Sequence, residues 1–492
     1  MTKILFQFKK IRTYLLFVII ILTNVELKSQ TECDSLENLY PDVPDYWSWN
    51  DSVNQITYKK WYNDLPDCKK YRRFRLSEYR QIPFNKREIV KEFYTVPGDT
   101  ILINDDFKDF ENLKEIMIIS CYIAGISKEL FKLPKLKTLF IATGYYIGQD
   151  KNNFLNGISE AQQLETLEIS EILGTETLSP EILELTNLQQ LKIVNLNASS
   201  LPDKYQNLTK LKELTLTDLA SSEIPTSLEN LTQIEYLKLS GKGISYIPEF
   251  ISDFKNLEFL DISGNIDVLD SNFGFFPKLT CLALSDNKLE NIDNLIDNLI
   301  SSDVKGLYYI DLTNNKFKKV PKNLTKFKSI VYLDLDSNDL ESFDVDFSKT
   351  GLGVLELSNN KLKDIPKSIS HSTESDLESP IVYMNDNNVE KLPDWIGEAN
   401  FPFLYLKNNK IKYFGTELCR KNDLKKVYLD GNPIEDFDPK ICECENGMLI
   451  SIIGADEKLS EKIRKYNNLE TDKVKIVTTE EEYEKYQYLI SD

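Results

Sequence analysis

The sequence predicts an α/β solenoid, in which short repeats each contribute one parallel strand and stack into a long array. Three observations support this prediction. The pattern L-x-x-L-x-L-x-x-N-x-L recurs in fourteen registers, most of them 22–24 residues apart. Eight consecutive registers place asparagine at the ninth position. The chain also has 492 residues, which is too many for one ordinary globular core.

Each L-x-L core predicts a short strand whose leucines point inward. A single repeat cannot bury that face alone, so neighbouring repeats must stack and share one core. Three steps are longer, at 28, 28 and 27 residues, and add loops at about 144–153, 291–305 and 370–380. The registers begin at Leu113, Leu136, Leu164, Leu188, Leu211, Ile234, Leu257, Leu279, Leu307, Ile330, Leu352, Ser379, Phe401 and Leu424.

The asparagines at the ninth position predict a structural ladder. The chain turns sharply after each strand, which leaves backbone groups in the interior, and a buried amide can bond to them. Losing one such partner costs ~1–3 kcal/mol. The first six registers are looser, with residues such as Cys121 and Gly144 at this position. The predicted ladder residues are Asn265, Asn287, Asn315, Asn338, Asn360, Asn387, Asn409 and Asn432.

Several registers continue with an Ile-Pro step, as at Ile224-Pro225 and Ile365-Pro366. The repeat, the asparagines and this step together resemble the leucine-rich-repeat family, in the form found in exported bacterial proteins. The resemblance covers roughly residues 113–440. It implies a curved horseshoe with the strands on its concave side. Such an array needs polar caps over its ends, and residues 30–112 and 441–492 are the predicted N-terminal and C-terminal capping regions.

Residues 1–29 are predicted to be a signal peptide. Four basic residues, from Lys3 to Arg12, precede nine apolar residues at 14–22. That run lies within the ~7–15 residues of a signal sequence and is shorter than the ~20 needed to span a bilayer. Cleavage is expected between Ser29 and Gln30, and an uncleaved anchor is the alternative. The sequence therefore predicts a secreted or cell-surface protein, held to the membrane only if this segment stays uncleaved.

The two capping regions have different compositions. The N-terminal region is rich in aromatic residues, including Trp47, Trp49 and Trp61. The C-terminal region predicts a helix at about 455–467, a strand at 473–478 and a helix at 479–490. Thr479 and Glu482 have the spacing of a capping box at the start of that second helix.

Seven cysteines in an exported chain predict disulfides. Cys419 and Cys442 each follow a ladder asparagine by ten residues, in adjacent repeats, so they are predicted to be close enough to bond. Cys33 and Cys68 form the natural second pair, although the sequence leaves the pairing open. A metal site at Cys442 and Cys444 is the alternative, but zinc takes about four ligands and none of the others lies nearby. No metal or cofactor is expected.

Composition also excludes several classes of function. The net charge of −19 argues against nucleic acid, because phosphate binding needs clustered Lys and Arg. The single histidine, His371, leaves little room for imidazole chemistry. An enzyme built around a catalytic cysteine is disfavoured, because residues 441–492 are only large enough for a cap. We expect no catalytic residues. A basic run at 68–75 could contact an anionic surface, but more often such a run is a solvated face.

The residues that flank the inward leucines are predicted to form a ligand-binding face. Tyrosine is favoured at interfaces, and a neighbouring column of Asp and Glu favours a basic protein or peptide partner. Two alternatives remain open: these residues only stabilise the sheet through cross-strand contacts, or they bind a glycan on an aromatic platform. The candidate residues are Tyr236, Phe259, Asp261, Tyr309, Asp311, Tyr332, Asp334, Glu356, Tyr383, Phe403, Tyr405 and Tyr428.

Overall fold

The protein divides into two compact units in the computed structural model, one made of residues 1–220 with 225–234 and the other of residues 221–224 with 235–492. The predicted signal peptide, Cys33, Cys68 and His371 lie outside the described residues. The structure describes residues 73–82, 84–95, 97–149, 151, 153–175, 177–195, 203–219, 223–304, 306–369, 381–399, 402–419, 424–445, 447–469 and 473–487.

The first unit contains a row of parallel strands. Each strand pairs with the next in the row, and short 3-10 helices connect them. The strands are β1 (Arg73–Arg75), β2 (Glu92–Tyr94), β4 (Glu115–Ile119), β6 (Thr138–Ala142), β8 (Thr166–Ser170), β9 (Gln190–Val194) and β10 (Glu213–Leu216). The 3-10 helices are η3 (Leu76–Gln81), η4 (Phe84–Ile89), η5 (Asp105–Asp109), η6 (Lys128–Leu130), η7 (Ile158–Glu160), η8 (Pro180–Glu184), η10 (Tyr205–Asn207) and η11 (Thr226–Asn230).

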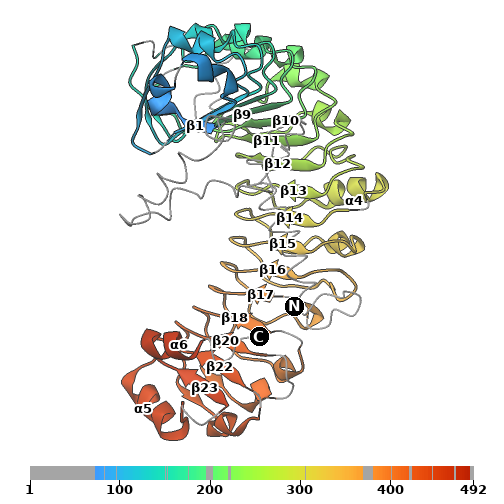
Figure 1. The fold of residues 1–492 in the computed structure, drawn as a ribbon. Helices are drawn as coiled ribbons and strands as arrows, with labels where there is room; N and C mark the ends of the chain where they lie inside the picture. Colours follow the sequence, from blue (N-terminus) through green and yellow to red (C-terminus); the bar gives the residue numbers. More distant parts are fainter. Residues whose placement is uncertain are drawn as a thin grey trace, which may run out of the picture. The chain divides into compact units, whose positions relative to one another are not determined.

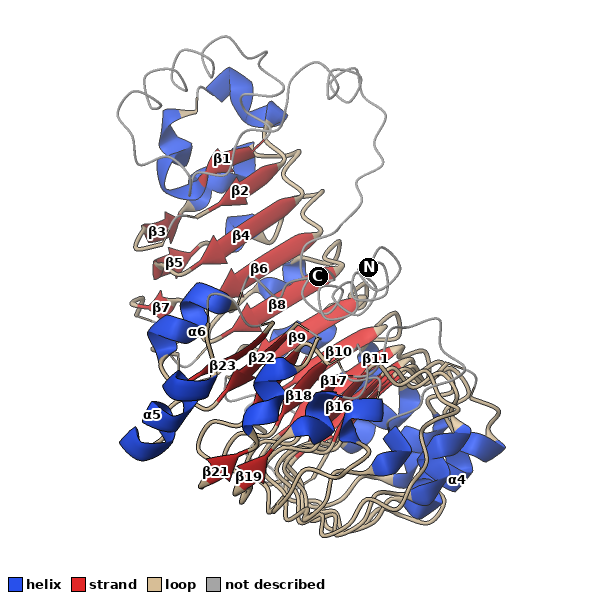
Figure 2. Cartoon of the chain, turned by 90° about the horizontal axis from the view of Figure 1, so that it is seen from below, coloured by secondary structure: helices blue, strands red, loops and turns tan. Residues whose placement is uncertain are grey.

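A second, smaller sheet lies beside the first strands of this row (Figure 2). It consists of β3 (Thr100–Ile103), β5 (Tyr122–Ile126) and β7 (Tyr145–Tyr146), all parallel. Ile101 and Ile123 point into the core and are 1% and 0% exposed. The alternate residues of these strands therefore face away from the core.

The second unit repeats the same arrangement, and Figure 1 shows its strands from β11 to β18 lying one above another. Each strand pairs in parallel with the next in the row. The strands are β11 (Tyr236–Ser240), β12 (Phe259–Ser263), β13 (Cys281–Ala283), β14 (Tyr309–Asp311), β15 (Tyr332–Asp334), β16 (Val354–Glu356), β17 (Ile381–Tyr383), β18 (Phe403–Tyr405), β20 (Lys426–Tyr428), β22 (Met448–Ser451) and β23 (Val474–Val477).

Helical segments and one short strand pair complete the second unit. β19 (Tyr413–Phe414) pairs with β21 (Asp436–Phe437). No helix among the described residues is long and apolar enough to cross a membrane. The helices are η12 (Glu249–Asp253), α4 (Asp293–Ser301), η13 (Lys322–Lys326), η14 (Lys367–Ile369), η15 (Ile396–Glu398), η16 (Thr416–Cys419), η17 (Pro439–Glu443), α5 (Glu457–Tyr466) and α6 (Glu480–Tyr486).

The predicted fold class is confirmed. Each of the fourteen sequence registers contains a strand that begins two residues after its first residue, from β4 after Leu113 to β20 after Leu424. The second residue of each strand from β11 to β20 is buried, as for Leu237, Leu260 and Leu282 at 0% exposure. These residues form the shared core that one repeat could not make alone.

The parallel strands extend past both predicted ends of the repeat domain. β1 and β2 precede residue 113 and pair in the same manner as the repeats, and β22 and β23 follow residue 440. The C-terminal region contains α5, β23 and α6 in the predicted order, but β22 was not predicted. The Glu482 amide donates to the Thr479 hydroxyl at 3.2 Å, which caps α6.

The asparagine side chains of the second unit form a hydrogen-bonded ladder. The Asn338 amide nitrogen donates to the carbonyls of Leu312 at 2.9 Å, Leu335 at 3.2 Å and Asp336 at 3.1 Å. Its oxygen accepts from the amide of Phe317 at 3.0 Å. Six ladder side chains are 5–8% exposed: Asn287, Asn315, Asn338, Asn360, Asn387 and Asn409. The terminal members, Asn265 and Asn432, are only partly buried.

The turn before each buried ladder asparagine uses a left-handed backbone conformation. Asp286, Asn314 and Asn359 have φ of 55°, 52° and 53°. Asp and Asn tolerate this region better than other side chains. In the last repeat the position is Gly431, with φ 73°, where glycine has no steric cost. At five of the six buried ladder positions an Asn-Asn or Asp-Asn pair therefore specifies first the turn and then the ladder, whereas Asn338 follows Ser337, at φ 54°.

The disulfide of the second unit differs from the predicted pair. Cys419 bonds to Cys444, with their Cα atoms 5.8 Å apart, and the prediction of a Cys419–Cys442 bond is wrong. Cys442 lies within η17, whereas Cys444 immediately follows it. Residues two apart in a 3-10 turn point about a third of a turn away from each other, so counting from the ladder asparagine did not identify the cysteine that faces Cys419.

Candidate binding face

Two columns of side chains run across the strands of the second unit, and we call them together the outer strand face. The strand registers place equivalent residues directly opposite one another, as for Tyr309 with Tyr332 and Asp311 with Asp334. Column one contains Tyr236, Phe259, Cys281, Tyr309, Tyr332, Val354, Ile381, Phe403 and Lys426. Column two contains Lys238, Asp261, Ala283, Asp311, Asp334, Glu356, Tyr383, Tyr405 and Tyr428. All twelve candidate residues from the sequence therefore lie on this face.

The aromatic residues of the outer strand face stack on one another. In column one, Tyr236 lies on Phe259 with ring centroids 4.1 Å apart, and Tyr309 lies on Tyr332 at 4.9 Å. In column two, three rings form a continuous stack, with Tyr383–Tyr405 at 4.3 Å and Tyr405–Tyr428 at 4.6 Å. Stacking occupies the ring faces inside each stack, so ring edges and hydroxyl groups are what the surface offers to a ligand.

The C-terminal helix α6 extends the tyrosine stack. The Tyr483 ring lies 6.1 Å from the Tyr428 ring, and the two hydroxyl oxygens are 3.1 Å apart. Sequence reasoning did not identify Tyr483, because it lies outside the repeats and no register relates it to the two columns. Tyr428 itself is only 9% exposed. The stack is therefore covered at this end and open toward Tyr383.

Two carboxylates on this side of the sheet form ion pairs with lysines of the preceding repeat. Lys238 lies 2.6 Å from Asp261, and Lys407 lies 2.9 Å from Asp430. Burial raises the pKa of Asp261, and the Lys238 ammonium opposes that effect. Asp261 is 8% exposed, so its carboxylate is already committed within the protein and is poorly placed to receive a ligand.

The next carboxylates of column two lie on three consecutive strands and have no such lysine. Asp311, Asp334 and Glu356 make no ion pair within the described part of the chain. Asp311 accepts from the Thr313 amide at 2.9 Å, and the Tyr332 hydroxyl donates to Asp334 at 3.0 Å. Three adjacent carboxylates without a cation form a partly buried acidic surface that favours a positive group from outside.

Burial and mutual repulsion alter the titration of these groups. Burial raises the pKa of Asp334, and it raises the pKa of Glu356 from 4.5 to about 8, with the Asp334 and Asp336 carboxylates acting in the same direction. Burial also raises the pKa of Tyr309 and Tyr332, whose hydroxyls remain protonated donors. At neutral pH the acidic surface therefore carries less than its formal charge, and a bound cation would favour full ionisation.

Substituting Glu356 with glutamine should remove part of the pH dependence of stability. The folded protein keeps a proton on Glu356 that the unfolded chain releases, so the free energy of unfolding falls as pH rises from 4.5 toward about 8. We expect E356Q to match the wild type at pH 5 and to exceed its free energy of unfolding by ~1–2 kcal/mol at pH 9, a figure discounted for partial exposure. Urea denaturation at both pH values measures this. An equal difference at both would contradict the assignment.

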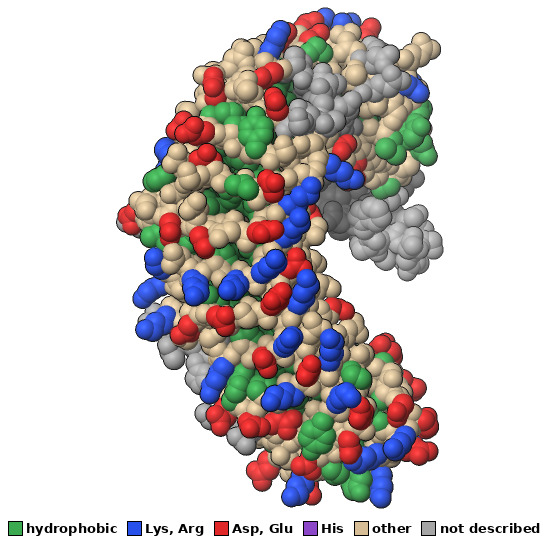
Figure 3. Space-filling model, turned by 180° about the vertical axis from the view of Figure 1, so that it is seen from behind, with side chains coloured by type: hydrophobic (Ala, Val, Ile, Leu, Met, Phe, Trp, Pro, Cys, Tyr) green, Lys and Arg blue, Asp and Glu red, His purple; other side chains and the backbone are tan. Residues whose placement is uncertain are grey.

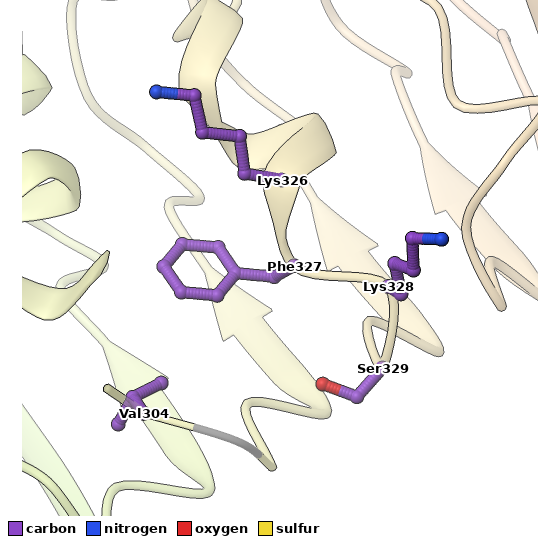
Figure 4. A pocket seen from close by; sticks show the side chains of 5 residues that line it. All are labelled: Val304, Lys326, Phe327, Lys328 and Ser329. Carbon is purple, nitrogen blue, oxygen red and sulfur yellow. The ribbon is translucent and has the colours of Figure 1, made fainter.

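Elsewhere among the described residues, a shallow pocket and mixed surface charges contrast with the ordered columns of the outer strand face. A shallow pocket in the second unit is lined by Val304, Lys326, Phe327, Lys328 and Ser329 (Figure 4). The Ser329 hydroxyl there donates to the Leu307 carbonyl at 2.9 Å and is not poised as a nucleophile. On the surface seen in Figure 3, acidic and basic side chains are interspersed. No group of three His, Cys, Asp or Glu among the described residues could hold a metal.

Comparison with solved structures identifies the class of fold. A leucine-rich-repeat protein of Leptospira interrogans matches with a TM-score of 0.60 and 22% identity, covering 80% of this chain and 92% of that protein. The functional domain of internalin J from Listeria monocytogenes, which includes a cysteine ladder, matches with a TM-score of 0.51 and 16% identity, over 75% and 71% of the chains.

A plant receptor has the same fold. The ectodomain of the receptor kinase GASSHO1/SCHENGEN3 from Arabidopsis thaliana, in complex with Casparian strip integrity factor 2, matches with a TM-score of 0.50 and 20% identity, over 73% of this chain and 46% of the ectodomain. No protein-family model and no curated protein sequence matches the chain. The protein is thus a leucine-rich-repeat solenoid, as the sequence pattern predicts. Of these three structures, the two bacterial proteins have TM-scores of 0.60 and 0.51, and the plant ectodomain has a TM-score of 0.50.

Proposed function

We propose that the protein is a non-enzymatic recognition module, secreted or held at the cell surface, that binds a basic protein or peptide on its outer strand face. One observation carries this proposal. Three consecutive carboxylates without an ion pair among the described residues, Asp311, Asp334 and Glu356, adjoin two groups of stacked rings: the Tyr309–Tyr332 pair lies beside them in column one, and the stack that begins at Tyr383 follows them in column two. A basic side chain could pair with the carboxylates while the rest of the ligand contacts the ring edges.

The ring geometry favours a protein ligand over a glycan. A sugar binds an aromatic side chain through the ring face, but in the Tyr383–Tyr405–Tyr428 stack neighbouring rings cover both faces of Tyr405 and the inner faces of the other two rings. Tyrosine edges and hydroxyls suit the mixed apolar and polar surface of a peptide. The plant receptor ectodomain, which is similar in fold, is complexed with a named factor, and this supports recognition as a use of the fold.

Export is supported by the cysteine chemistry. The Cys419–Cys444 disulfide is the kind of bond that persists in oxidising compartments and is rare in a reducing cytosol. The basic and apolar segment at 1–29, although outside the described residues, has the composition of a signal peptide. Both features agree with a protein that meets its ligand outside the cytosol.

Selection from a displayed random-peptide library on immobilised residues 30–492 tests the proposal. We expect enriched peptides to contain Lys or Arg. We expect their affinity to fall at least about tenfold, ~1.4 kcal/mol, in a variant that replaces Tyr309, Tyr332 and Tyr383 with alanine. Tyr246→Ala is the matched control, because Tyr246 is 45% exposed and belongs to neither column.

Three outcomes would contradict the proposal. The triple variant could retain every enriched peptide, or the wild type could enrich none above background. The triple variant could also lose thermal stability without losing any ligand, which would assign the tyrosines to cross-strand stabilisation of the sheet. Binding that free sugars compete away, and that survives protease treatment of the target, would support the glycan alternative instead.

A further inference from the structure

The small sheet of the first unit presents an apolar surface to solvent. Five large side chains gather on β3, β5 and β7, on the residue after β7 and on the chain that pairs with β7, and we call them the apolar patch. The three strands contain no charged residue. The patch residues are Leu102, Tyr122, Tyr145, Ile147 and Leu173, which are 50%, 49%, 46%, 48% and 64% exposed.

The apolar patch is continuous across neighbouring strands. Tyr122 pairs with Tyr145 in the strand register, and Tyr145 pairs with Leu173. The Tyr122 and Tyr145 ring centroids lie 6.5 Å apart. The opposite side of the same sheet is buried, as for Ile123 at 0% exposure. A contiguous surface of large apolar side chains marks a site of association, because burying it is favourable.

Two glycines keep the apolar patch low in relief. Leu102 pairs with Gly125 in the strand register, and a β-carbon at Gly125 would lie 3.3 Å from the Leu102 Cδ1 atom. Gly174 has φ 84°, and a β-carbon there would lie 3.2 Å from the Tyr145 Cε1 atom. The Leu102 and Tyr145 side chains therefore lie across glycine backbone. A flat sheet face of this kind suits packing against another sheet, as in two-layer β-sandwiches.

The area of the apolar patch matches one side of a small interface. A leucine, isoleucine or tyrosine side chain that is about half exposed presents ~100 Å², so the five present ~500 Å², within the ~300–600 Å² of the largest apolar patch on a typical monomer. Two such surfaces in contact bury ~1,000 Å², which is the lower limit for a specific protein interface. The patch can therefore form the centre of an interface between two copies of the chain.

The charge of the chain favours this surface for contact between copies. At a net charge of −19, two copies repel each other in most orientations. The apolar patch has no charge, and Asp99, which immediately precedes β3, pairs with Arg75 at 2.5 Å. A partner selected by opposite charge would find nothing here to recognise. An isologous two-fold interface needs one surface that tolerates itself, and an uncharged, flat patch meets that requirement.

We propose that two copies of this chain associate through the apolar patch as a two-fold dimer, with Tyr122, Tyr145 and Leu173 of each copy at the centre of the interface. Neither tyrosine hydroxyl has a hydrogen-bond partner among the described residues, so both can donate to groups of the second copy. This inference is independent of the ligand-binding proposal, because it uses residues of the first unit only.

Sedimentation equilibrium of residues 30–492 tests the proposal. We expect the wild type to be dimeric at about 50 µM, because small specific interfaces commonly have micromolar dissociation constants. Tyr145→Asp with Leu173→Asp should raise the dimer dissociation constant at least ~100-fold, since each aspartate enters the two-fold interface twice and meets like charge. Val268→Asp is the matched control, because Val268 is 71% exposed and lies in the second unit. It should leave the dissociation constant unchanged.

A mixture of oppositely charged variants tests whether the patch meets its own counterpart. Tyr145→Lys with Leu173→Lys should be monomeric alone and should form a heterodimer with the aspartate variant, because opposite charges then face each other. Three results would overturn the proposal: a monomeric wild type, which would assign the patch to another partner; a dimer that survives in the aspartate variant; or a mixture that stays monomeric. Circular dichroism establishes that each variant is folded, so loss of fold cannot imitate dissociation.

Discussion

Replacing Asn338 with alanine should lower the free energy of unfolding of the second unit by about 3 kcal/mol. The substitution removes three hydrogen bonds donated to carbonyls and one accepted from the Phe317 amide. Each buried backbone group that is left without a hydrogen-bond partner costs ~1–3 kcal/mol. Water does not readily replace the lost partners, because the site is enclosed. Urea denaturation followed by circular dichroism measures the loss.

The matched control for this change is Asn272→Ala. Asn272 is exposed and its side chain is not part of the ladder, so its loss should alter the free energy of unfolding by less than about 0.5 kcal/mol. Asn265→Ala and Asn432→Ala should fall between the two, because these terminal ladder residues are only partly buried. Equal effects for Asn338 and Asn272 would contradict the structural role of the ladder.

Substituting Cys444 with serine should destabilise the second unit by ~3 kcal/mol. The Cys419–Cys444 bond closes a loop with a sequence separation of 25, which contains β20 and β21. In the chain-entropy description, opening a loop of this size restores about 3 kcal/mol of conformational freedom to the unfolded chain. Thermal unfolding with and without a reductant measures the effect, and reduced wild type should resemble the variant.

Cys442→Ser is the control that separates the two possible pairings. If Cys419 bonds to Cys444, the Cys442 variant should keep the disulfide and the stability of the wild type. Peptide mapping by mass spectrometry identifies the bonded cysteines directly. A Cys442 variant that loses the bond, together with a Cys444 variant that keeps it, would restore the pairing expected from the sequence.

The strands and the ladder could be predicted because each depends on a repeated local signal. The spacing of leucines fixes which residues enter the core, and the Asn-Asn and Asp-Asn pairs fix the turn that follows. β22 was missed because residues 448–451 are followed by no ladder asparagine. The pairing of β1 and β2 with the repeats was also not predicted, because no ladder asparagine follows either strand in the sequence.

The sequence register predicts which residues lie on the candidate face, but it does not predict the ion pairs and ring contacts that these residues make. Register alone placed Asp261 and Asp334 in one column. Only the structure separates them, because Asp261 pairs with Lys238 while Asp334 lies among other carboxylates. Tyr483 joined the stack through the docking of α6, which depends on tertiary packing. The cysteine pairing depended on the direction of two side chains around one turn, which residue counting does not resolve.

Because neighbouring strands pair in the same register throughout, whole repeats can be removed or added while the side-chain columns stay aligned. Because Tyr309 faces Tyr332 and Asp311 faces Asp334, removing residues 309–331 would bring Cys281 opposite Tyr332 with every column still aligned. Insertions such as the one that contains α4 fall between strands and leave this alignment unchanged. Gene duplication or recombination at repeat boundaries could therefore shorten, lengthen or reorder the recognition surface without requiring a new fold.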